Sequence, residues 1–207
     1  MKNKRTLIII GIIAILAVFI YVQVVEITNE KTDYQWEWWV VLAAFILLEA
    51  LVVLIIFLAN RQKYKKLCDA YCKKDYSSVI KLSKCLTSRY LDEKAKDNGR
   101  VYLAVANFEL ENYDKFLEEI DKIRHEDVVS KKYFWLWVYN LKLSQTEQLD
   151  YYKECLQNCK DSENKEKALR MLNLIEKRQS NSYEMDSSDL EFVKDITSDT
   201  LKNLMRI

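Results

Sequence analysis

Two uninterrupted apolar stretches near the start of the chain constrain its fold more than any other feature. They cover Leu7–Val25 and Trp38–Ala59, and a helix needs roughly 20 apolar residues to cross a bilayer. From Asn60 onward the sequence is polar, charged and periodic. The pattern predicts a transmembrane hairpin in residues 1–60, with spans at about 7–25 and 38–59, that carries a water-soluble domain.

The soluble part is predicted to be all-α. The chain has no Pro and only two Gly, whereas tight β-hairpins usually need these residues at their turns. Apolar residues recur at helical spacing through residues 61–178, which we expect to form a cytoplasmic domain of paired helices. In residues 179–207 we expect a polar linker and an amphipathic helix that begins at the capping box Ser188–Glu191. The expected helices before it are Lys63–Lys73, Tyr76–Thr87, Asn98–Leu110, Tyr113–Arg124, Ser130–Leu143, Glu147–Cys159 and Glu163–Arg178.

Charged residues flank the two apolar stretches asymmetrically. Cations precede the first stretch and directly follow the second, while the connection Glu26–Glu37 holds four carboxylates and one Lys. The positive-inside rule then predicts a multi-pass protein of the plasma membrane with both termini in the cytoplasm. A cleaved signal peptide is the alternative for the first stretch, but its apolar core is long and no small-residue cleavage site follows. The excess of Lys over Arg points to a bacterial source. The cations after the second stretch are Arg61, Lys63, Lys65 and Lys66.

Glu49 lies near the middle of the second apolar stretch. An ionisable side chain at that depth is costly and usually marks a function. The first stretch offers no polar partner at the same depth. Two interpretations stay open. Glu49 contacts another membrane chain or forms a proton or cation site, or it is a neutral carboxyl bonded to backbone or to a second copy of itself.

A weak repeat is visible in the soluble part. The segments Tyr76–Ile80 and Tyr113–Leu117 occupy equivalent places, 37 residues apart. Around the second copy lie the pair Leu103–Ala104, the turn Glu111–Tyr113 and, at helical spacing, Phe116, Ile120 and Ile123. With these residues the segment 100–123 resembles a tetratricopeptide repeat, although the family's Trp, Tyr and closing Pro are absent and the spacing exceeds the usual 34 residues. The resemblance implies an α-solenoid of stacked helix pairs. A generic helical bundle is the alternative.

A stack of helix pairs presents a concave face that receives protein partners. The resemblance places Val101, Val105 and Phe108 on that face. These side chains are apolar, so the capture of a C-terminal carboxylate known in some members of the family is not implied.

Residues that could carry chemistry are few. The pairs Cys68/Cys72 and Cys155/Cys159 have helical rather than zinc-knuckle spacing, which favours buried thiols over a metal site. His125 is the only histidine, and no Gly-rich phosphate loop is present. The aromatic segment 133–139 is apolar almost all round, which predicts a helix buried in the domain rather than the wall of a ligand site. We therefore expect no enzyme, no cofactor and no metal.

Charge also bears on the partners. Residues 1–60 hold four of the 32 cations and five of the 31 carboxylates, which leaves 28 and 26 in the soluble part. This balance does not favour nucleic-acid binding. We expect a membrane-anchored adaptor or scaffold that binds a protein, with the lipid bilayer and a second copy of the chain as further partners. The alternative is a small accessory subunit of a transporter or pore, with Glu49 as its intramembrane polar element.

Overall fold

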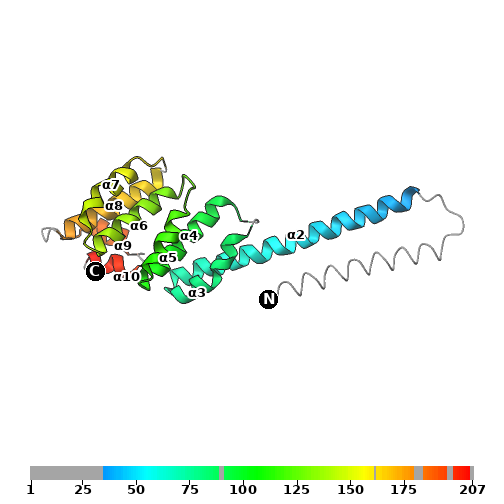
Figure 1. Ribbon diagram of the computed structural model, residues 1–207, viewed down its shortest axis with the longest axis horizontal. Coiled ribbons are helices and arrows are strands. Elements are labelled where there is room, and N and C mark those ends of the chain that lie inside the picture. The colour runs from blue at the N-terminus through cyan, green and yellow to red at the C-terminus, as the bar shows by residue number, and fades with distance from the viewer. Residues whose placement is uncertain (1–34, 89–90, 161, 180–183, 195–197, 206–207) are drawn as a thin grey trace. The chain divides into compact units, whose positions relative to one another are not determined.

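The computed structural model describes residues 35–88, 91–160, 162–179, 184–194 and 198–205, and every regular element in these ranges is a helix (Figure 1). The all-α prediction is therefore confirmed for this part of the chain. The first apolar stretch, Leu7–Val25, lies outside the described residues, and so does the predicted hairpin. The chain divides into two compact units, Met1–Leu58 and Ala59–Ile207.

Helix α2 (Gln35–Cys72) contains the second apolar stretch and continues without a break through the expected helix Lys63–Lys73. Its last turns belong to the core of the second unit. Leu67 is fully buried and Ala70 is 8% exposed, in one apolar cluster with side chains of the following helices. The ring of Tyr71 stacks on that of Tyr102 with 4.5 Å between the centroids.

The helices that follow, as far as Gln179, match the expected ones within about five residues. The largest difference is that α4 begins at Glu93 rather than Asn98, because the Asp92 carboxylate accepts a hydrogen bond of 2.6 Å from the Ala95 N–H and caps the helix there. The elements after α2 are α3 (Tyr76–Leu82), the 3₁₀ helix η1 (Ser83–Thr87), α4 (Glu93–Glu109), α5 (Tyr113–Asp121), α6 (Val129–Lys142), the 3₁₀ helix η2 (Thr146–Gln148), α7 (Leu149–Gln157), α8 (Ser162–Gln179), α9 (Ser187–Val193) and α10 (Asp199–Met205).

Three connections between helices repeat one backbone geometry. Each contains one residue in the left-handed region, and the N–H of the next residue closes the turn onto the carbonyl five residues earlier, as in a Schellman cap. The left-handed residues are Lys74 (φ 58°), Glu111 (φ 60°) and Ser144 (φ 57°). The closing bonds run from Asp75 to Ala70 at 2.9 Å, from Asn112 to Asn107 at 2.8 Å and from Gln145 to Asn140 at 2.8 Å. The turn expected at Glu111–Tyr113 is thus one of three equivalent turns.

The main core surrounds the aromatic helix α6. Each residue from Phe134 to Val138 is at most 9% exposed, so the prediction that this segment is a buried helix is confirmed. The ring of Phe108 lies between those of Phe116, at 5.2 Å, and Trp135, at 5.7 Å. Helices α4, α5, α6 and α8 are held together by these apolar contacts.

The C-terminal segment differs from the single helix that was expected from Ser188. It holds two short helices, α9 and α10, and α9 is capped by Asp186, whose carboxylate accepts a 2.8 Å hydrogen bond from the Asp189 N–H. The predicted capping box at Ser188 is therefore wrong. In α10, Leu201 and Met205 are buried in the main core, so this helix covers the stack.

Candidate functional site

One segment of the described residues, Leu42–Cys72 in α2, is long and apolar enough to cross a membrane. Ten of its large apolar side chains between Leu42 and Leu58 are at least 40% exposed. A helix with many exposed apolar side chains is suited to lipid or to other apolar helices. This segment is the first candidate functional element.

Glu49 is exposed on that segment. Along the sequence the nearest charged residues are Glu37 and Arg61, and no residue in the described ranges forms a hydrogen bond or ion pair with the Glu49 carboxyl. A polar group on an otherwise apolar exposed helix is available to a neighbouring chain, a cation or a proton.

The three side chains expected on a partner-binding face lie in the core instead. Val101 is 4% exposed, and Val105 and Phe108 are fully buried. They lie on α4 and belong to the cluster that α5 and α6 complete. Packing within the helical unit therefore accounts for the apolar spacing of these three residues. They present almost no surface to a partner.

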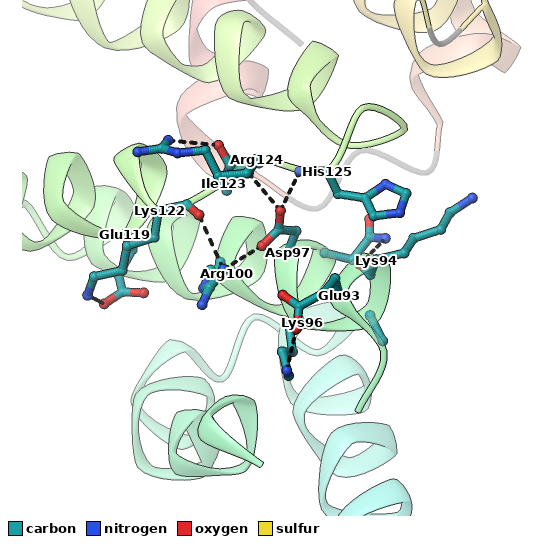
Figure 2. Close-up of polar contacts among 12 residues, drawn as sticks. Glu93, Lys94, Lys96, Asp97, Arg100, Glu119, Lys122, Ile123, Arg124 and His125 are labelled. Carbon is teal, nitrogen blue, oxygen red and sulfur yellow. Dashed lines mark hydrogen bonds and ion pairs between the residues drawn. The ribbon is translucent and has the colours of Figure 1, made fainter. Parts of the chain in front are cut away.

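Asp97 forms a polar centre that the sequence reasoning missed (Figure 2). It lies on α4 and is 2% exposed. Its carboxylate accepts hydrogen bonds from the backbone N–H groups of Arg124 and His125, both at 2.7 Å, and pairs with Arg100 Nη1 at 2.6 Å. The same Arg100 nitrogen also donates to the Lys122 carbonyl at 3.2 Å. Asp97 and Arg100 together join α4 to the connection between α5 and α6.

This arrangement suits a structural clamp better than an acid or base. Burial acts to raise the pKa of Asp97, but the N–H groups of His125 and Arg124 and the Arg100 guanidinium outweigh it and hold that pKa below its usual range. Both carboxylate oxygens are already engaged. The only sequence signal was the Asp97–Arg100 spacing of three, which many exposed helix pairs share.

The thiols and the histidine do not converge. Within the described ranges no group of three or more His, Cys, Asp or Glu side chains is placed to hold a metal ion. Cys85 is buried, and that burial raises its pKa, which keeps the thiol protonated and weakly nucleophilic. His125 is half-buried, and its Nδ1 accepts a 3.2 Å hydrogen bond from the Asp127 N–H.

A hollow of about 390 Å³ lies along α8 beside α9. Arg170 is one of the residues that line it and donates to the Ser188 carbonyl at 3.2 Å and to the Asp189 carboxylate at 3.0 Å. The Arg170 guanidinium also lies over the Phe192 ring, 4.3 Å from its centroid. These contacts tie α9 to α8, so the hollow is part of the packing between the two helices.

The chain was compared with family models, curated proteins and solved structures, and none of them matches it.

Proposed function

We propose that the chain is a membrane-anchored adaptor whose helical unit binds a protein partner. One observation carries the proposal, namely that the side chains of α2 are exposed in one part of the helix and buried in another. Its residues 42–58 expose apolar side chains suited to lipid, while Leu67 and Ala70 of the same helix lie in the core of the helical unit. On this proposal, the exposed apolar part of this helix anchors the unit in the membrane.

The three equivalent turns support a stack of helix pairs, which is the kind of helical unit that an adaptor needs. They divide the chain into helix pairs of similar construction, as in tetratricopeptide-like solenoids, whose stacked pairs bind partners along their exposed faces. Because Val101, Val105 and Phe108 are buried, we expect contact at the large apolar side chains that remain exposed. These are Leu110, Leu117, Tyr151 and Leu190, which are 37% to 61% exposed.

Photo-crosslinking in intact membranes tests the adaptor. A photoreactive amino acid replaces Leu117, Tyr151 or Leu190 in the full chain, and Lys115 and Glu154, exposed polar positions on α5 and α7, are the matched controls. We expect an adduct of one defined mass from at least one apolar position and none from the controls. Adducts at no position, or the same adducts at apolar and control positions, would contradict a specific partner surface.

The second candidate is an accessory subunit whose membrane segment does the work, and the exposed Glu49 favours it. Glu49→Gln keeps hydrogen bonding without ionisation, whereas Glu49→Leu removes both. If a neutral Glu49 contacts a partner helix, Gln should preserve co-purification and Leu should weaken it by about 0.6–2 kcal/mol. If Glu49 is a proton or cation site, Gln should fail as Leu does. If the wild type and both variants recover the same amount of partner, Glu49 does not contribute to the contact.

A further inference from the structure

Four cations form a compact group on α2 directly after its apolar stretch, and we name Arg61, Lys63, Lys65 and Lys66 the basic collar. No Asp or Glu occurs between Glu49 and Asp69. Arg61, Lys65 and Lys66 are exposed and Lys63 is half-buried. Within the described part of the chain none of the four joins an ion pair, whereas Lys122, for example, contacts Glu118 at 2.8 Å.

One side of α2, next to the collar, packs against the core of the helical unit. Leu67 is fully buried and Tyr64 packs against the same cluster, which places these two side chains on the face of α2 that meets the helical unit. Arg61 and Lys65 are four residues apart and therefore share a face of the helix, and both are exposed. Three of the four collar residues, Arg61, Lys65 and Lys66, are thus turned to solvent, while Lys63 is half-buried.

The collar begins two residues after Ala59, the last residue of the apolar stretch. With a rise of about 1.5 Å per residue, Lys66 lies roughly 10 Å along the helix from Ala59. The headgroup layer of a leaflet is about 5–8 Å thick, and charges interact over a screening length of about 8 Å at physiological salt. If Ala59 lies at the edge of the hydrocarbon, all four cations are within reach of lipid headgroups.

We propose that the basic collar binds anionic lipid headgroups and gives the protein a preference for acidic phospholipids. The inference depends on the membrane anchoring proposed above. Clusters of Lys and Arg that directly follow a membrane helix are suited to acidic lipids. Arg61 can donate two parallel hydrogen bonds to a phosphate, while the three lysines act as point charges. Each cation close to such a surface changes affinity by roughly fivefold.

Lipid retention by the full chain tests the collar. The protein is purified in a neutral detergent, incubated with equal amounts of phosphatidylglycerol and phosphatidylcholine, and re-isolated, and the bound headgroups are quantified by mass spectrometry. The test variant changes all four collar residues to Gln. The matched control changes Lys115, Lys160, Lys194 and Lys202 to Gln, which removes the same charge from positions beyond the collar. Resistance of each variant to carbonate extraction from membranes is measured in parallel.

We expect the wild type and the control to retain phosphatidylglycerol in excess, and the collar variant to lose that excess by about tenfold or more. High salt should reduce the excess, because screening shortens the reach of the charges. Equal loss in collar and control variants, or no excess in the wild type, would overturn the lipid site while leaving the anchor intact. Extraction of the wild type by carbonate would instead refute the membrane anchoring itself.

Discussion

At the scale of single residues, Asp97 shows how one buried charge can organise a helical unit. Its carboxylate accepts hydrogen bonds from two backbone N–H groups, which lie 27 and 28 residues later in the chain. It also accepts one from the guanidinium of Arg100, three residues later. Buried N–H groups at a chain turn need acceptors, and a carboxylate supplies stronger bonds than a neutral group would. The α5–α6 connection is therefore held to α4 by polar contacts as well as by apolar packing.

Replacing Asp97 with Asn should lower the free energy of unfolding by about 3 kcal/mol at neutral pH, because Arg100 and two N–H groups lose their anionic partner. The folded pKa of Asp97 is depressed. Its stabilisation is therefore complete above the ordinary aspartate pKa of about 3.9 and is lost as pH falls through the lower folded value. Urea titrations of the full chain in detergent from pH 7 to pH 3 measure both effects.

The difference between the wild type and Asp97→Asn should shrink only at the acidic end of that series. Asp114→Asn, on the exposed surface of α5, is the control and should change stability little at any pH. A cost for Asp97→Asn that is the same at pH 7 and pH 3 would show that the charge of Asp97 is not what stabilises the clamp.

Gly99 illustrates a second residue-scale effect. A Cβ at this position would lie 2.3 Å from Cδ2 of Leu86 and 3.2 Å from Cε2 of Tyr64. A larger residue at this position would have to displace the ends of these two side chains. Two Gly in the whole sequence favoured helices over hairpin turns, but nothing in that count indicated that one of them lies in a helix–helix contact.

At the scale of elements, the turns at Lys74, Glu111 and Ser144 are built alike although none contains Gly. A residue with a side chain in the left-handed region costs roughly 1–2 kcal/mol. The turns persist because the Schellman bonds satisfy helix carbonyls and the flanking helices are packed. A short, tight reversal therefore sets the antiparallel pairing of the helices before and after each turn.

Ser144→Gly should raise the free energy of unfolding by about 0.5–1 kcal/mol, because glycine relieves the left-handed strain while it costs some entropy in the unfolded chain. All three left-handed residues are exposed, but Lys74 and Glu111 each join an ion pair. Replacing Ser144 removes no such ion pair, so the effect on the backbone is measured most cleanly there. Lys115→Gly, inside α5, is the matched control and should lower stability by about 1 kcal/mol. Denaturation followed by tryptophan fluorescence gives both numbers, and a loss of stability in Ser144→Gly would contradict the strained turn.

The helices were largely predictable, because each carries apolar residues at a period near 3.6 residues. That period can be recognised within a short window of sequence. Periodicity does not reveal which neighbour covers an apolar face. For that reason Val101, Val105 and Phe108 were expected on a binding face, whereas the structure buries them beneath α5 and α6. The clamp at Asp97 could not be predicted either, since its backbone donors depend on the path of a connection far along the chain.

At the scale of the whole molecule, the side chains of α2 differ in exposure along the helix. Its apolar side chains between Leu42 and Leu58 are exposed, and Leu67 and Ala70 are buried in the helical unit. The sequence separated these two parts by composition alone and placed a new helix at Lys63. The structure instead continues one helix from Gln35 to Cys72.

A cysteine-labelling scan along α2 in native membranes tests this account most directly. Single cysteines replace Leu47, Leu54, Arg61, Lys65 or Asp69 in a chain whose five native cysteines are changed to Ser, and each is treated with a water-soluble maleimide. The account predicts that Leu47→Cys and Leu54→Cys are protected until detergent is added, while Arg61→Cys, Lys65→Cys and Asp69→Cys react once the membrane is permeable to the reagent. Rapid labelling of Leu47→Cys and Leu54→Cys without detergent would contradict it.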